Sequence, residues 1–282
     1  MTQTPPVERR SFSWRNFAIR AASGLVLAAL ALGSVWLFEK GGLARAPFLA
    51  LMCIGGVLLA IEWSAMATPK SRSRSTIAVA FAVILVILFA FVGRFVEAWI
   101  AMAAGAVAAA VAAKVGGDLA RDGAYGVFYI APACLVLMWL IESPQGSGWT
   151  TMFFACAWSA DIFAFIVGSA LGGPKLWPRW SPNKTWSGFF GGLAGAVAIS
   201  VGVAWFAMRL SLTGAALIGV LGGLATMAGD LWESVLKRRF GVKDAGSLIP
   251  GHGGLLDRVD GMMFAVMIFA AARLIVQVGW NH

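Results

Sequence analysis

The sequence predicts an all-α integral membrane protein, a polytopic transmembrane helix bundle of about nine transmembrane helices with its N-terminus in the cytoplasm. Of its 282 residues, 60% are hydrophobic and only 12% are charged, and the mean hydropathy is +0.81. Too few charged residues are present to cover the surface of a soluble domain of this length. The 34 glycines fit a membrane bundle, because glycine lets transmembrane helices approach closely.

Nine apolar stretches, each of about 17 to 25 residues, are long enough to cross a bilayer as helices. The first follows a basic tail and ends in Trp36-Leu37-Phe38 rather than in small residues, so we expect a retained span and not a cleaved signal peptide. The fourth is rich in alanine and gives the weakest hydropathy signal. The expected ranges are 18–38, 47–67, 76–93, 95–113, 124–141, 149–171, 188–208, 213–233 and 260–279.

Short loops connect these stretches, so no inserted soluble domain is expected. We divide the chain into a cytoplasmic N-terminal tail at 1–17, N-terminal transmembrane helices over 18–145, and a C-terminal transmembrane region over 146–282 that carries the predicted chemistry. This last region contains two polar cytoplasmic loops, at 172–187 and 234–259. Because both loops face the same side of the membrane, we expect them to form one site.

The distribution of basic residues supports this count and orientation. With the N-terminus inside, the tail and the first residues of the span that follows it carry four Lys or Arg residues, Arg20 included, and the cytoplasmic loops carry three, two, three and five. The inside total of 17 compares with four outside, and Arg273 falls within the last span. An excess of Lys and Arg in cytoplasmic loops is typical of membrane proteins.

The net charge of +9 does not indicate a nucleic-acid partner, because the basic residues lie in short loops and not on one soluble face. The expected partner is the lipid bilayer. Cys53, Cys134 and Cys156 lie inside apolar stretches without metal-ligand spacing, so we interpret them as small buried hydrophobic residues.

Most of the polar chemistry lies between Ser234 and Asp260. Cations, acids and flexible backbone together suit a phosphate-bearing substrate and its divalent metal. Beside a membrane, this combination indicates chemistry on a lipid phosphate. The segment contains Lys237, Arg238, Arg239, Lys243, Asp244, Gly251-His252-Gly253-Gly254, Asp257, Arg258 and Asp260.

Three carboxylates are the predicted metal ligands. Asp230 lies near the cytoplasmic end of the eighth span, with Glu233 and Ser234 on the same helical face. Asp257 and Asp260 are spaced i, i+3 on a first helical turn, so they can share a hard cation such as Mg2+. The alternative for each acid alone is structural, as an ion-pair partner or as an acid that complements the helix dipole.

Other residues extend the candidate site. The glycines beside His252 would let backbone amides approach an anion, although a flexible turn gives the same pattern. Asp161 lies near the middle of the sixth span, where an acid is functional or pairs with a buried cation. The stretch Ser181-Pro182-Asn183-Lys184-Thr185 offers a lysine and two hydroxyl groups for a phosphate. Glu62 and Glu97 are interpreted as interfacial.

The order of these elements resembles the signature of the phosphatidate cytidylyltransferases, also called CDP-diacylglycerol synthases. Gly229-Asp230, the stretch from Ser181 to Thr185, and Asp161 are similar to that family as well. The resemblance covers the C-terminal half in detail, and it departs at Ser187-Gly188, where the family usually has Glu-Gly. The signature is Ser234, Lys237-Arg238, Lys243-Asp244, His252-Gly253-Gly254 and Asp257-Arg258-Val259-Asp260.

This resemblance implies a Mg2+-dependent enzyme that transfers a cytidylyl group from CTP to phosphatidic acid, giving CDP-diacylglycerol and pyrophosphate. It implies Asp230, Asp257 and Asp260 as catalytic ligands of one or two metal ions, with Lys237 and Arg258 beside them. A bacterial inner membrane, an active site on its cytoplasmic side and a homodimer are compatible with it. The substrate-binding residues are then Ser181, Lys184, Thr185, Ser234, Arg238, Lys243, Asp244, His252, Gly253, Gly254 and Asp161.

Two rival functions are weighed against this one. A CTP-dependent polyprenol or phytol kinase would transfer the γ-phosphoryl group of CTP to an alcohol and release CDP. An anion transporter, from a different class, would show inverted repeats and charges spread through the bundle. The sequence shows no repeat, and its charges gather at the predicted cytoplasmic face.

Overall fold

The computed structural model describes residues 14–178, 180–208, 210–246 and 253–278. Within these ranges the chain forms nine long helices, one short 3-10 helix and one hairpin of two strands. The predicted helical bundle is therefore confirmed. The long helices are α1 (Trp14–Phe38), α2 (Ala46–Ala67), α3 (Arg72–Phe91), α4 (Phe95–Val115), α5 (Ala120–Glu142), α6 (Gly146–Leu171), α7 (Trp186–Ala207), α8 (Leu212–Arg239) and α9 (Leu256–Val278).

Each predicted transmembrane stretch coincides with one of these helices, with boundaries that differ by a few residues. Among the residues that the structure describes, eight helices are long and apolar enough to cross a membrane, and α1 adds the shorter apolar segment Gly24–Phe38. Large side chains such as Ile77, Phe165 and Phe206 are exposed on the outside of the bundle. Outward apolar side chains on long apolar helices are typical of an integral membrane protein.

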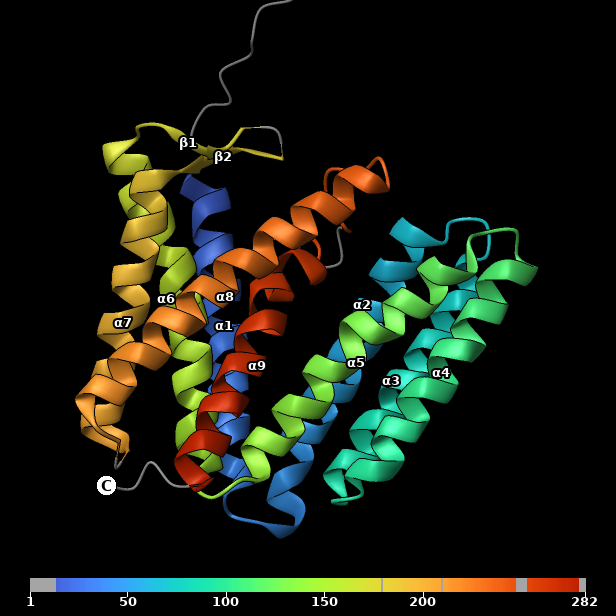
Figure 1. Cartoon of the computed structure of the whole chain (residues 1–282), viewed down its shortest axis with the longest axis horizontal. Helices are drawn as coiled ribbons and strands as arrows, with labels where there is room; N and C mark the ends of the chain where they lie inside the picture. Colours follow the sequence, from blue (N-terminus) through green and yellow to red (C-terminus); the bar gives the residue numbers. More distant parts are fainter. Residues whose placement is uncertain (1–13, 179, 209, 247–252, 279–282) are drawn as a thin grey trace, which may run out of the picture.

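Figure 1 shows α8 crossing the bundle on a diagonal. On one side α6 and α7 pack together, and on the other side α3 packs against α4 and α5. Between them, α9 packs against α8, α5 and α6. Because α8 is tilted, it begins beside α7 and its C-terminal end lies near the ends of α2 and α5 (Figure 1).

The C-terminal end of α8 extends beyond the predicted membrane boundary at residue 233 and ends at Arg239. Its last turn holds three basic residues, which interact favourably with the helix dipole. Gly241 then adopts the left-handed conformation (φ 73°), and its N–H donates to the carbonyl of Arg238 at 3.2 Å. The first part of the predicted loop 234–259 is therefore helical, so its polar residues are held on a rigid element.

A small antiparallel hairpin occupies the predicted loop 172–187. It consists of β1 (Lys175–Trp177) and β2 (Ser181–Thr185), with Lys175 opposite Thr185. β2 leads directly into α7, where the Thr185 hydroxyl accepts a hydrogen bond from the Gly188 N–H at 3.1 Å. This N-cap fixes the hairpin to the start of a helix. The hairpin is an addition to the predicted bundle and does not change its class.

Aromatic side chains hold the end of α8 against the N-terminal half of the chain. The Trp63 ring lies 5.5 Å from Tyr125 and 5.8 Å from Phe240, measured between centroids. Trp63 also donates its indole N–H to the backbone carbonyl of Asp122 at 2.9 Å. The Asp122 carboxylate in turn pairs with Arg239. These contacts join α2, α5 and α8 at one end of the bundle.

α8 and α9 pack closely because glycines face each other across their interface. A Cβ atom on Gly229 would lie 2.5 Å from the backbone oxygen of Asp260, and one on Gly261 would lie 2.7 Å from the Thr226 carbonyl oxygen. Small residues allow such backbone contact between membrane helices. The contact sets Asp230 and Asp260, the neighbours of these glycines in the chain, beside the same interface.

Replacement of Gly229 by alanine is expected to lower the thermal stability of the bundle. The added methyl group would clash with the α9 backbone, and such overpacking costs about 1–3 kcal/mol. The matched control is Gly202→Ala in α7, where a Cβ would meet no heavy atom within 4 Å. Thermal unfolding in detergent measures both variants, and equal midpoints would contradict the close contact.

Candidate active site

Acidic and basic side chains gather where α8, α9 and the hairpin meet. Asp230, Glu233 and Lys237 are spaced i, i+3 and i+7 on α8, so they share one helical face. Asp257 and Asp260 lie in the first turns of α9, as their spacing predicted. The glycine contact between α8 and α9 brings these two faces together.

Lys237 connects the two helices through an ion pair on each side. Its Nζ atom lies 2.5 Å from Glu233 Oε2 and 2.6 Å from Asp257 Oδ1. The side chains of Lys237 and Asp257 are each only 14% exposed, and that of Glu233 is 1% exposed. Each charge has lost most of its hydration, so each depends on the others for compensation.

Asp257 also binds the two chain segments that precede α9. Its Oδ2 atom accepts hydrogen bonds from the N–H groups of Ala245 at 3.1 Å and Gly254 at 3.3 Å. Together with Lys237, these donors engage both carboxylate oxygens of Asp257. The side chain therefore organises the protein around it, in addition to any role toward a substrate.

A second pair of acids lies beside this bridge. The carboxyl groups of Glu233 and Asp260 are within hydrogen-bonding distance of each other. Asp260 is 7% exposed and accepts the N–H of Gly261 at 2.7 Å. Glu233 Oε1 is buried and receives no hydrogen bond from any donor in the part of the chain that the structure describes. A proton or a cation between two neighbouring buried carboxyl groups would lower their mutual repulsion.

The hairpin contributes Lys184, which forms an ion pair with Asp230. The two side chains are partly exposed, 26% and 35% respectively, so this pair is accessible from outside the helices. Asp161 from α6 is near enough to interact electrostatically with Asp230, Lys184 and Arg258. The pair between Lys184 and Asp230 links the loop 172–187 to α8; the convergence of the two polar loops on one site stays a prediction.

Four charged residues of the predicted site are exposed, and we call this set the rim: Arg238, Lys243, Asp244 and Arg258. Arg238 donates to the Val242 carbonyl at 3.3 Å and so closes the end of α8. Arg258 projects from the first turn of α9, one residue after Asp257. Their exposure leaves this rim open to an anionic ligand.

The remaining predicted residues are less exposed or have structural partners. Ser181 on β2 and Ser234 on α8 are half-buried. Thr185 caps α7 and shares a hydrogen bond of 3.0 Å with Ser187, which also donates to the Gly172 carbonyl.

Gly253 and Gly254 lead into α9, and Gly254 contacts Asp257 through its N–H. The Gly254 amide thus binds a carboxylate of the protein itself, and a role of these glycines toward a substrate anion stays a prediction. His252 lies outside the described residues.

Two acids that are not among the predicted site residues, Glu233 and Glu62, belong to the same assembly. Glu233 had a detectable signal, because it shares a helical face with Asp230. Glu62, interpreted above as interfacial, is instead buried at 2% exposure and binds the start of α9. Nothing local in the sequence indicates this contact, since Glu62 and Leu256 are 194 residues apart.

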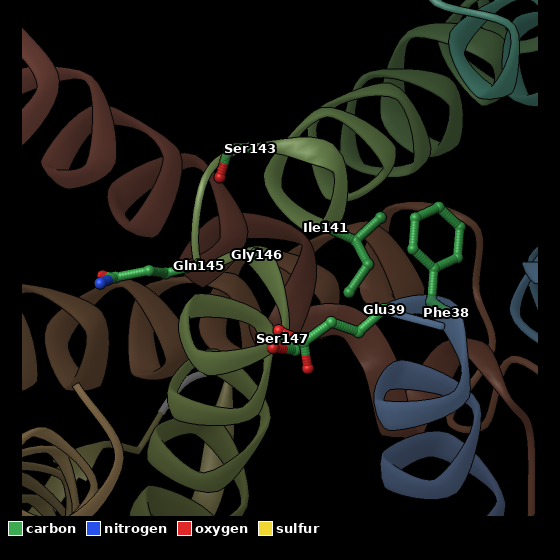
Figure 2. Close-up of a pocket in the computed structure, with 7 residues that line it drawn as sticks. All are labelled: Phe38, Glu39, Ile141, Ser143, Gln145, Gly146 and Ser147. Atoms are coloured by element: carbon green, nitrogen blue, oxygen red, sulfur yellow. The ribbon is translucent and has the colours of Figure 1, made fainter. Parts of the chain in front are cut away.

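A pocket of about 170 Å³ lies at the opposite end of α5. Figure 2 shows the Glu39 side chain directed toward Ser147, whereas Gln145 points away. The lining offers one acid and no lysine or arginine, so it does not suit a phosphate. The lining residues are Phe38, Glu39, Ile141, Ser143, Gln145, Gly146 and Ser147.

Comparison with known proteins places this geometry in context. Residues 18–276 match the model of the cytidylyltransferase family. A phosphatidate cytidylyltransferase of Pseudomonas aeruginosa is 35% identical over 279 residues, which cover 93% of this chain and 98% of the relative. One from Brucella abortus is 48% identical over 147 residues, or 51% of this chain and 54% of the relative. One from Synechocystis is 46% identical over 123 residues, which cover 43% of this chain and 41% of the relative.

The extent of these matches differs. In the Brucella comparison the chain spans about half the length of the relative it matches, whereas the Pseudomonas comparison runs through nearly the whole of both chains.

Replacement of Lys237 by methionine is expected to destabilise the protein by about 3 kcal/mol, because Glu233 and Asp257 would stay buried without their cation. The matched control is Lys114→Met, which removes an exposed lysine from the last turn of α4 and should change stability by less than about 0.5 kcal/mol. Thermal or denaturant unfolding in detergent checks both. Indistinguishable curves would show that the two ion pairs contribute little.

Proposed function

The chain belongs to the cytidylyltransferase family, and we propose that it converts CTP and phosphatidic acid to CDP-diacylglycerol and pyrophosphate in phospholipid biosynthesis. One observation carries the proposal: carboxylates and lysines from α6, α8, α9 and the hairpin meet at one end of an otherwise apolar bundle. A site at the end of a membrane bundle can receive a lipid phosphate from the bilayer and a nucleotide from water.

The reaction forms a bond between a phosphate oxygen of phosphatidic acid and the α-phosphorus of CTP. The bond from the α-phosphorus to the oxygen bridging to the β-phosphorus breaks, and pyrophosphate leaves. Because the attacking phosphate is already ionised at neutral pH, no general base is required. The protein must bring two anions together and stabilise the charge that develops on the leaving group.

Partly exposed cations are the residues that meet this requirement. Lys184 is 26% exposed, and Arg258, Lys243 and Arg238 lie on the rim. We assign them contacts with the phosphate oxygens of the two substrates. Lys237 is enclosed between Glu233 and Asp257, so we assign it the positioning of those acids and not a direct grip on substrate.

Mg2+ would suit this site, because carboxylate oxygens are its usual protein ligands and a buried oxygen of Glu233 has no hydrogen-bond donor within the described residues. We propose Asp230, Asp257 and Asp260 as the ligands of this ion, with Glu233 adjacent and with a second cation permitted by the number of carboxylates. When bound, Mg2+ would neutralise charge on the triphosphate and on the departing pyrophosphate. Within the described residues, no three acid, histidine or cysteine side chains lie together as a group that could hold a metal ion. Substrate phosphates would therefore complete the coordination.

We place this site on the cytoplasmic side of a bacterial inner membrane. The predicted bias of basic residues toward that side supports the orientation, and the relatives compared above are bacterial. A homodimer stays a prediction that rests on the glycine-rich helices alone.

The proposed reaction is tested with purified protein in detergent, phosphatidic acid, Mg2+ and CTP labelled at the α-phosphate. Label is expected in lipid, with stoichiometric pyrophosphate, and Asp260→Asn is expected to lower the rate at least about 100-fold by removing one acid of the cation site. Label transferred from the γ-phosphate of CTP to a polyprenol would instead identify a kinase. Absence of both transfers would refute the enzyme and favour transport.

Lys184→Met is expected to lower kcat/KM for CTP by about 100-fold, or about 2.7 kcal/mol, because one charge-assisted contact to phosphate is lost. Lys184→Arg, which keeps the charge, should retain more of the activity. Lys175→Met supplies a matched control, since Lys175 is an exposed lysine on the other strand of the hairpin. A similar loss in the Lys175 variant would show that the hairpin as a whole, and not the Lys184 charge, matters.

A further inference from the structure

The start of α9 lacks a residue that could cap it locally. The helix begins at Leu256, and the carbonyl of Leu255 accepts the first helical bonds, from the N–H groups of Arg258 at 2.9 Å and Val259 at 3.2 Å. Leu255 therefore stands at the N-cap position. Leucine is among the poorest N-cap residues, because it has no side-chain acceptor for the free amides of a first turn.

The missing acceptor comes from another helix. Glu62 on α2 accepts the Leu255 N–H at 2.9 Å through Oε1 and the Leu256 N–H at 2.6 Å through Oε2. The carboxylate is 2% exposed. Its charge lies at the helix N-terminus, where the dipole favours an anion. One residue from the N-terminal half of the chain therefore caps the helix that carries Asp257 and Asp260.

The backbone is shaped to admit this carboxylate. A Cβ atom on Gly246 would lie 2.6 Å from Glu62 Oε1, and one on Gly254 would lie 3.1 Å from Glu62 Oε2 and 2.8 Å from Asp257 Oδ2. The absence of side chains at both glycines lets the backbone pass directly beside two acids. Glu62 from α2 and Asp257 from α9 therefore both accept hydrogen bonds from the backbone of residues 254–256, where α9 begins.

We propose that Glu62 is a positioning residue for the reaction: as a remote N-cap it fixes the first turn of α9 and thereby the placement of Asp257, Arg258 and Asp260. The proposal rests on the proposed function for its catalytic consequence. Asp257 and Asp260 are three residues apart on that turn, so a shift or rotation of the helix start moves both together. Residues that orient metal ligands typically affect metal affinity or activity about 10- to 100-fold.

The test is Glu62→Gln in the full-length protein. The amide oxygen can accept one N–H, while its NH2 group would face the other, so the cap is halved without a change in size. Hydrogen exchange of the peptide that covers Leu255 and Leu256 is expected to speed up by about 10-fold or more. With CTP and phosphatidic acid, kcat should fall about 10- to 100-fold and half-maximal activity should need more Mg2+, whereas KM for CTP stays within about 2-fold.

The matched control is Glu142→Gln. Glu142 is likewise an acid held by a partner in the protein, although it is only partly buried, and it pairs with Arg45 at the far end of α5. This variant should lose thermal stability without a change in Mg2+ dependence or in exchange at the start of α9. Glu62→Asp, which keeps the charge on a shorter side chain, should be intermediate in kcat. It also serves as the working variant if Glu62→Gln fails to fold.

Hydrogen exchange tests the N-cap, and the activity measurements test the positioning role and the proposed reaction, so each can fail separately. Unchanged exchange in Glu62→Gln would overturn the cap itself. Faster exchange with unchanged kcat and Mg2+ dependence would overturn the positioning role and leave a structural cap. If the wild-type protein transfers no cytidylyl group, the proposed function fails and the positioning role with it, while the exchange result still decides whether Glu62 caps α9.

Discussion

A carboxylate removed from water needs a cation or several N–H groups, and this requirement organises the region where α2, α8 and α9 meet. Lys237 serves Glu233 and Asp257 at once, with distances of 2.5 and 2.6 Å. Two backbone amides serve Glu62. Because Lys237 joins α8 to Asp257 on α9, and Glu62 joins α2 to the start of α9, satisfying these acids fixes α2, α8 and α9 relative to one another.

The packing of the helices and the pairing of the charges depend on each other. Lys237 reaches Asp257 only if α8 and α9 are close, and they are close because Gly229 and Gly261 admit the opposite backbone. The charge pairing at the hairpin likewise depends on how α8 is placed. This helix is tilted across the bundle (Figure 1), and its Asp230 pairs with Lys184 of the hairpin. A change at either glycine would therefore alter the electrostatics of the site as well as its packing.

The sequence predicted those features that depend on local pattern. Apolar runs of membrane length predicted all nine helices, and the i, i+3 spacing predicted that Asp257 and Asp260 begin a helix. The hairpin was not predicted, because its strands have only three and five residues and no apolar alternation. The local sequence pattern could not predict that Glu62 caps α9, because only tertiary packing brings together residues almost two hundred positions apart. Pairing also changed the interpretation of Lys237, which the family resemblance had presented as a catalytic residue beside the metal ligands.

The balance of charge around the site bears on how two anionic substrates could enter it. Five carboxylates, from Asp161, Asp230, Glu233, Asp257 and Asp260, interact there with Lys184, Lys237 and Arg258. With all groups ionised, acids exceed bases, and a triphosphate approaching such a cluster would be repelled. The carboxylates are therefore suited to a substrate that arrives with divalent cations, while the exposed bases on the rim suit the phosphates themselves. The buried Lys237 belongs to neither group: its charge is already compensated by two acids, and its contribution is to hold them in place.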